Sequence, residues 1–185
     1  MAKPRAAATR EVATRKSKPG FSILVLSGPN LERLGRREPH IYGRVTLGEI
    51  HASLAEHAAL RGAAVDCRQS NHEGTLVDWI NAAKDSGFDG ILLNAGALTH
   101  TSYALHDSLK GAELPAVEVH VSNPDARESF RHVSCIAAAV RARVAGFGPR
   151  SYAVALDGLL GLLDEPGAAR KVPARRRPRA TRSTA

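Results

Sequence analysis

Cysteine and aromatic residues are scarce in this 185-residue chain, and long apolar runs are missing. The two cysteines, Cys67 and Cys135, lie far apart in no metal-binding spacing, so the sequence predicts buried thiols rather than a disulfide framework or a zinc site. No run of about 18 apolar residues could span a bilayer, and the first residues lack the apolar core of a secretory signal. We therefore expect a cytoplasmic protein that binds no metal and contacts no membrane.

Positive charge is concentrated at the two ends of the chain. Residues 1–20 hold six Lys or Arg and one acid, and residues 167–185 hold seven and none, so within a net charge of +8 the body at 21–166 is acidic. The ends show no apolar period, which predicts two disordered tails around one domain. The aromatic residues that could stack on bases mostly lie in apolar runs: Trp79, Phe88, Phe130 and Phe147. Contact with nucleic acid is therefore expected only through the tails, and only weakly.

Apolar periodicity predicts an alternation of strands and helices. Strands are predicted at 21–27, 63–69, 90–93, 115–121 and 141–146, and helices at 47–61, 73–86, 101–112 and 149–163, with one helical turn at 125–130. Short connections between such elements favour a mostly parallel α/β sheet with helices on both faces, in the flavodoxin-like order 2-1-3-4-5. In that order Asn30, Asn94 and His120 follow neighbouring strands, so we expect them at one crevice.

A long polar loop follows the first predicted strand. Residues 31–43 are rich in Gly and Arg, and loops of this length in compact domains are often lids, although a solvated connector is the alternative. Arg37 lies near Tyr42 in this loop. A guanidinium beside a phenol favours the phenolate and lowers a pKa that starts near ~10, which would suit a general base. A structural Arg–Tyr contact is the alternative.

A histidine and a glutamate share one side of the fourth predicted strand. His120 lies two residues after Glu118, so the carboxylate could orient the imidazole and hold it protonated as a general acid. A structural histidine is the alternative. Arg127 and Arg131 could clasp a carboxylate or form a solvated face.

Three other polar segments have structural as well as functional interpretations. The turn at 94–101 could hold an anion on its free amides, or simply begin a helix capped by Thr99 or Thr101. Asp107 is interpreted as a solvated carboxylate, and 70–74 as a helix cap.

Four long motifs occur in one order along the chain: GPNLERLGRREPHIYG, RQSNHEGTLVDWI, LNAGALTHTSYALHDSL and EVHVSNPDARESFRHVS. Together they resemble the type II 3-dehydroquinate dehydratases of the shikimate and quinate pathways over residues 23–160. The resemblance implies a cofactor-free lyase that converts 3-dehydroquinate to 3-dehydroshikimate by anti elimination through an enolate. It also implies a homo-oligomer, a dodecamer of trimers.

The resemblance further implies roles for individual residues. Tyr42 would be the base and His120 the acid. Arg37 would stabilise the phenolate, and Asn30 would place an ordered water. Substrate contacts would come from Asn94, His100, Asp107, Val121, Ser122 and Arg131, with Asp107 reaching in from a neighbouring subunit.

The chain departs from the family pattern at three positions and at its tails. Asp125 stands where a histidine is common, His106 where an arginine is common, and Cys135 in a usually aliphatic stretch. The alternative function is a catalytically silent homologue that binds partners through its basic tails. Because the implied base, acid and arginine are all present, the sequence favours the enzyme.

Overall fold

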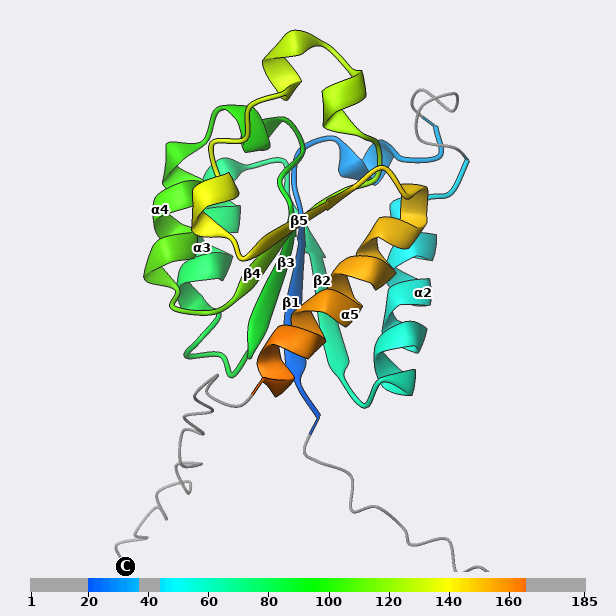
Figure 1. Ribbon diagram of the computed structural model, residues 1–185, viewed down its shortest axis with the longest axis vertical. Helices are drawn as coiled ribbons and strands as arrows, with labels where there is room; N and C mark the ends of the chain where they lie inside the picture. The colour runs from blue at the N-terminus through cyan, green and yellow to red at the C-terminus, as the bar shows by residue number, and fades with distance from the viewer. Residues whose placement is uncertain (1–19, 37–43, 166–185) are drawn as a thin grey trace, which may run out of the picture.

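Five strands form one parallel sheet in the order β2-β1-β3-β4-β5 (Figure 1). The computed structural model describes residues 20–36 and 44–165. The strands are β1 (Ser22–Ser27), β2 (Ala64–Gln69), β3 (Gly90–Asn94), β4 (Ala116–His120) and β5 (Ala142–Ala145). This order confirms the predicted fold class, and each strand end lies within one residue of its predicted position.

Helices cover both faces of the sheet. In the described residues, α2 (Leu47–Leu60) and α5 (Ser151–Asp164) pack on one face, and α3 (Glu73–Ala82) and α4 (Tyr103–Gly111) on the other (Figure 1). Successive side chains of a strand point to opposite faces, so Val25 of β1 belongs to the first core and Leu26 to the second. The central strands β1, β3 and β4 are thus buried on both sides, whereas the edge strands β2 and β5 are partly exposed.

The start of α2 follows the sequence closely. The Thr46 hydroxyl accepts a hydrogen bond from the Glu49 backbone N–H at 3.2 Å, and the Glu49 carboxylate accepts one from the Thr46 N–H at 2.8 Å. This is the capping box that the sequence contains, and it satisfies two of the amides that a helix start leaves unpaired.

The start of α4 differs from the prediction. Its N-cap is Ser102, whose hydroxyl accepts the Leu105 N–H at 2.9 Å, so the predicted cap at Thr99 or Thr101 is wrong. The physical reason is a short 3-10 helix, η2 (Gly96–His100), which occupies the preceding residues and delays the start of α4.

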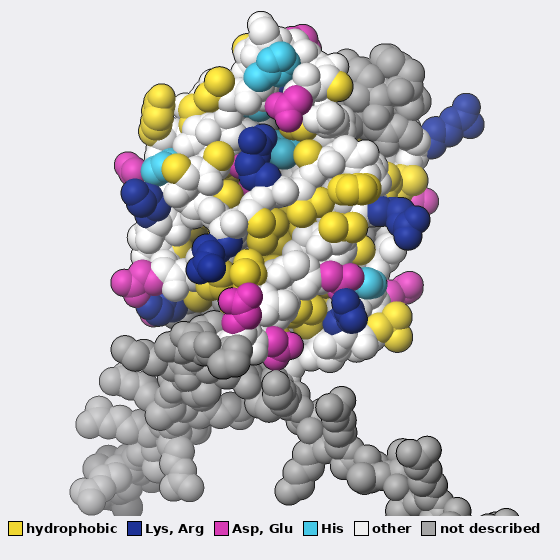
Figure 2. Space-filling view, in the orientation of Figure 1, with side chains coloured by type: hydrophobic (Ala, Val, Ile, Leu, Met, Phe, Trp, Pro, Cys, Tyr) yellow, Lys and Arg dark blue, Asp and Glu magenta, His cyan; other side chains and the backbone are white. Residues whose placement is uncertain are grey.

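The exposed aromatic residues also differ from the prediction. Phe130 and Phe147 are each 61% exposed, whereas Trp79 and Phe88 are partly buried. Phe130 lies in the short 3-10 helix η4 (Ser129–Arg131) and Phe147 lies just after β5, and both segments are too short for a period to fix a face. Figure 2 shows acidic and basic side chains interspersed on the face that carries α5.

Residues 1–19 and 166–185 lie outside the described residues, so the predicted tails and their boundaries stay predictions. None of the helices in the described ranges has the length and apolar character to cross a membrane.

Candidate active site

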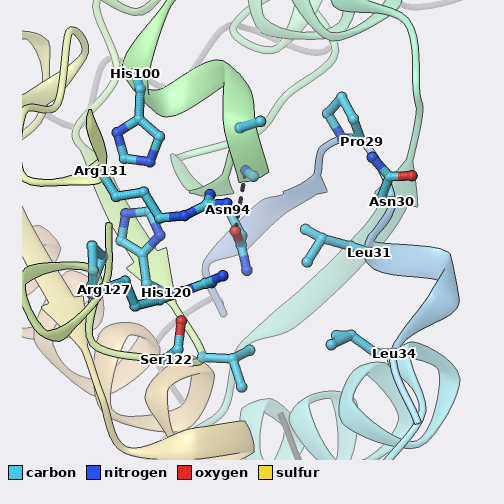
Figure 3. Close-up of a pocket in the computed structure, with 14 residues that line it drawn as sticks. Pro29, Asn30, Leu31, Leu34, Asn94, His100, His120, Ser122, Arg127 and Arg131 are labelled. Atoms are coloured by element: carbon cyan, nitrogen blue, oxygen red, sulfur yellow. Dashed lines mark hydrogen bonds between the residues drawn. The ribbon is translucent and has the colours of Figure 1, made fainter. Parts of the chain in front are cut away.

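A pocket opens at the carboxyl ends of β1, β3 and β4 (Figure 3). It is lined on one side by the end of β1 and the short 3-10 helix η1 (Leu31–Arg33), and on the other by η2, the end of β4 and the short 3-10 turns that follow β4. The lining includes eight residues singled out from the sequence: Asn30, Asn94, His100, His120, Val121, Ser122, Arg127 and Arg131. Parallel α/β sheets bind their ligands at this edge.

A buried carboxylate holds the pocket histidine. The Nε2 of His120 lies 2.6 Å from Oε1 of Glu118, and Glu118 is fully buried. The Ser134 hydroxyl donates to the other carboxylate oxygen at 2.7 Å, and Arg143 Nε donates to Oε1 at 3.0 Å. Arg143 stands directly opposite Glu118 in the β4–β5 pairing. The alternation along β4 thus placed His120 and Glu118 on one side, as the sequence indicated.

The environment of Glu118 keeps it ionised. Burial raises the pKa of this carboxyl, but hydrogen bonds from His120 and Ser134, together with the charges of His120 and Arg143, outweigh burial and leave the pKa below its usual value. An ionised carboxylate can only accept, so it receives the Nε2–H of the imidazole and fixes the orientation of the His120 ring. Sequence reasoning missed Ser134 and Arg143, because only the packing of the chain brings them to Glu118.

Asn94 is fixed from the core side of the pocket. Its Oδ1 accepts the Gly96 N–H at 3.3 Å, the dashed line in Figure 3, and its Nδ2 donates to the Tyr152 hydroxyl at 3.1 Å. Tyr152 lies 3.5 Å from the hydroxyl of Ser27, which in turn lies 3.2 Å from Nε2 of His51. No sequence pattern marked Tyr152 or His51 as part of a site.

The wall of the pocket that faces Asn30 and Leu31 is cationic (Figure 3). Arg127 and Arg131 both line it, and Arg131 is held by Glu128, with Nε 2.8 Å from the carboxylate, and by stacking over the Phe130 ring at 4.6 Å. The hydrogen bond with Arg131 lowers the pKa of Glu128 to about 2. The His100 ring donates from Nδ1 to the carbonyl of Val133 at 2.7 Å, which leaves Nε2 free of that bond.

The segment after β1 is held in a specific backbone conformation. Asn30 has φ 66°, in the left-handed region, and its N–H donates to Oδ1 of Asn71 at 2.8 Å. A Cβ on Gly28 would lie 2.4 Å from the carbonyl oxygen of Ala95, so only glycine lets β1 pass this close to the β3–η2 turn. Asn71, in the segment interpreted as a helix cap, therefore also supports the pocket.

Besides Glu118, which lies behind His120, three predicted site residues are not in the described pocket. Arg37 and Tyr42 lie outside the described residues. Asp107 is exposed on α4 and does not line the pocket of its own chain. Across the described ranges, no three His, Cys, Asp or Glu side chains gather closely enough to hold a metal ion.

Two of the three departures from the family pattern contact each other. The His106 ring donates from Nδ1 to the carbonyl of Cys135 at 2.8 Å, and the Cys135 thiol donates to the carbonyl of His100 at 3.0 Å. These bonds tie α4 and η2 to the segment that carries the pocket arginines. Asp125 is exposed beyond β4.

The fold and the pocket define a class of protein: an α/β protein with a flavodoxin-like strand order, a cationic pocket at the strand ends, and a histidine–carboxylate pair suited to acid–base chemistry. A family model described as dehydroquinase class II matches residues 21–160. The chain belongs to this family.

Individual relatives agree with the family model. A 3-dehydroquinate dehydratase of Rhodopseudomonas palustris (strain HaA2) is 56% identical over 138 residues, covering 75% of this chain and 91% of that protein. The crystal structure of a type II dehydroquinase from Butyrivibrio crossotus superposes with a TM-score of 0.75 at 40% identity, covering 76% of this chain and 98% of that one. A type II dehydroquinase structure from Propionibacterium acnes gives 0.73 at 42% identity, covering 78% and 99%.

Proposed function

We propose that the pocket at the strand ends is where this hydro-lyase dehydrates 3-dehydroquinate to 3-dehydroshikimate, with Tyr42 as the base and His120 as the acid. The substrate carries a C3 ketone and, at C1, a carboxylate and a hydroxyl group. The proton at C2 is acidic because it lies next to the ketone. Its removal gives an enolate, and loss of the C1 hydroxyl as water then forms the conjugated double bond.

The observation that carries this proposal is the buried pair of His120 and Glu118 at the pocket wall. Glu118 accepts from Nε2 of the imidazole, so the other ring nitrogen is the one available to substrate. Donation of a proton from this ring nitrogen to the C1 oxygen lets the hydroxyl group leave as water instead of hydroxide, which is the role of a general acid.

The placement of the base rests on the sequence and on the flanks of its segment. Leu34, just before the segment at 37–43, lines the pocket. A Cβ on Gly35 would lie 2.7 Å from the carbonyl oxygen of Arg44, so the described ends of that segment lie side by side at the pocket rim. Tyr42, as a phenolate stabilised by Arg37, would take the C2 proton.

The remaining pocket residues suit the polar groups of the substrate. Arg131 would bind the C1 carboxylate from the cationic wall, and Asn94 would donate to a hydroxyl group. Val121 and Ser122 would contribute main-chain amides, and His100 a ring nitrogen. Asn30 would hold a water against the enolate oxygen, the kind of preorganised donor that stabilises developing charge.

The proposal also includes assembly. Asp107 is exposed on α4, and it would complete the pocket of a neighbouring subunit in a dodecamer of trimers. Mixing inactive Asp107→Ala and Tyr42→Phe subunits after dissociation tests this point. Recovery of activity on reassociation is expected, and its absence would contradict a shared site.

The direct test is turnover by the purified protein. With 3-dehydroquinate alone, absorbance of the conjugated enone product is expected to grow, unaffected by a chelator or by borohydride. Inactivation by borohydride in the presence of substrate would indicate a Schiff base and would contradict the enolate mechanism. In the described residues no lysine lines the pocket: Lys84 pairs with Glu113, and Lys110 is exposed on α4.

Matched variants test the two roles. Tyr42→Phe and His120→Ala are each expected to lower kcat by ~100-fold or more. Tyr103→Phe, at a tyrosine 73% exposed on α4, and His72→Ala, at an exposed histidine outside the pocket, serve as controls with near-normal turnover. A Tyr42→Phe protein with normal kcat would place the base elsewhere. A folded wild-type protein without turnover would favour the silent binding module.

A further inference from the structure

Tyr152 is a buried titratable residue for which the proposed reaction has no use. It belongs to α5, is 1% exposed, and directs its hydroxyl at the core side of Asn94. Burial raises the pKa of the Tyr152 phenol, so the group stays protonated and neutral. A buried hydroxyl must find hydrogen-bond partners, and this one finds Asn94 and Ser27.

The hydrogen bonds around Asn94 have only one consistent direction. The Gly96 N–H can only donate, so the amide atom facing it is Oδ1, and Nδ2 therefore faces Tyr152 as a donor. The tyrosine oxygen accepts this bond, and the Ser27 hydroxyl 3.5 Å away is the other partner described for it, so the tyrosine proton has Ser27 as its acceptor in a network with every donor paired. The serine proton then goes to Nε2 of His51.

His51 suits the end of such a chain. Burial lowers the pKa of the His51 imidazole and so favours the neutral ring, whose Nε2 can accept a hydrogen bond. The chain of hydrogen bonds thus extends from the η2 backbone through Asn94 to α2, and in it each donor faces an acceptor. One N–H of the Asn94 amide is used by Tyr152, and the other remains for the pocket.

We propose that Tyr152 is a positioning residue of the active site, which fixes the Asn94 amide so that its second N–H points at a hydroxyl group of the substrate. The inference rests on the proposed function, because it needs Asn94 to bind substrate. It adds a part of the site that lies wholly behind the pocket: the Tyr152 hydroxyl touches Asn94 and Ser27 but does not line the cavity.

The test is the near-isosteric Tyr152→Phe in the full chain. Its KM for 3-dehydroquinate is expected to rise by about tenfold, the factor that corresponds to one neutral hydrogen bond of a buried group, with kcat changed by less than about threefold. The control for simple destabilisation is Leu159→Val, a fully buried residue of the same helix that packs near Gly90 at the far end of the sheet. It is expected to lower the melting temperature similarly and to leave KM unchanged.

A double-mutant cycle separates positioning from a structural role. In an Asn94→Ala background, Tyr152→Phe is expected to cause no further rise in KM, because the group it positions is gone. A KM for Tyr152→Phe within about twofold of wild type, or an equal loss in both backgrounds, overturns the proposal.

Two further measurements keep the outcome decisive. If Tyr152→Phe does not fold, Ser27→Ala removes the acceptor of the tyrosine proton and is expected to raise KM about threefold, again only when Asn94 is present. No rise in that variant overturns the proposal.

Wild-type turnover is measured first: its absence refutes the proposed function and this inference together, whereas normal wild-type turnover with an unaffected variant refutes only the role of Tyr152.

Discussion

Replacing Arg143 by methionine should destabilise the protein in a way that depends on pH. The guanidinium donates to Glu118 across the β4–β5 pairing at 3.0 Å, and methionine keeps much of the apolar stem without the charge. Glu118 is fully buried, so it cannot replace this partner with bulk water. It would keep only its bonds with His120 and Ser134.

The loss of stability in Arg143→Met can be derived from the hydrogen bond that is removed and from the exposure of the Arg143 side chain. A hydrogen bond to a charged group contributes about 1.5–3 kcal/mol. The Arg143 side chain is 35% exposed, so solvent screening reduces this to about 1–2 kcal/mol. For a domain of this size, a loss of that order lowers the melting temperature by about 3–6 °C.

The sign of the pH dependence is fixed by Glu118. Its folded pKa lies below the ordinary 4.5, so its ionisation contributes stability that is present above that value and is lost as the pH falls through the folded pKa. Without Arg143 the pKa of Glu118 in the folded protein rises, and its ionisation then stabilises the fold less. The difference in the free energy of unfolding between wild type and Arg143→Met should therefore be largest at neutral pH and should decrease as the pH falls below 4.5.

Thermal melts of both proteins at several pH values, with Arg141→Met as the charge-matched control, measure this gap. Arg141 is exposed just before β5, and its replacement should cost little at any pH. An equal effect of the two substitutions, or a gap that stays constant down to pH 3, would refute the assigned role of Arg143.

Three other predictions follow from the fold. Asn71→Ala removes the acceptor of the Asn30 N–H and should lower kcat/KM several-fold in steady-state assays, while Tm falls by only a few degrees. Gly28→Ala places a methyl group 2.4 Å from a backbone oxygen and should cost about 3 kcal/mol or more in denaturant melts; Gly48→Ala, with no atom within 4 Å, should be neutral or stabilising. A shortened chain of residues 21–166 should keep its kcat at ~0.15 M salt, where the field of the tails is screened. Loss of turnover on shortening would show that the tails contribute to the site.

The sheet was predictable because its signals are local. Apolar runs, the capping box at Thr46 and the short connections each follow from neighbouring residues, and together they leave few topologies for a parallel sheet. The pairing of His120 with Glu118 was predictable for the same reason, since alternate residues of a strand share a side.

The rest of the site depends on contacts between distant residues. Arg143 reaches Glu118 across 25 residues, and Tyr152 reaches Asn94 across 58, and neither residue stands in a pattern that distinguishes it from an ordinary strand or helix position. The cap of α4 was predicted wrongly because several hydroxyl residues compete within 99–102 and only tertiary packing selects Ser102. Side chains in very short elements, such as Phe130 of the 3-10 helix at Ser129–Arg131, have no period from which exposure could be predicted.

The residues of β5 and α5 that support the site are synthesised after the residues that they contact. Glu118 and Asn94 emerge from the ribosome well before Arg143 and Tyr152, the residues that brace them from β5 and α5. A nascent chain that has formed β1 to β4 would carry Glu118 and Asn94 without these supports. Truncation before residue 143 would also remove the α5 side chains that form much of one core, so we expect such a chain to be inert, whereas loss of a single brace only weakens the protein.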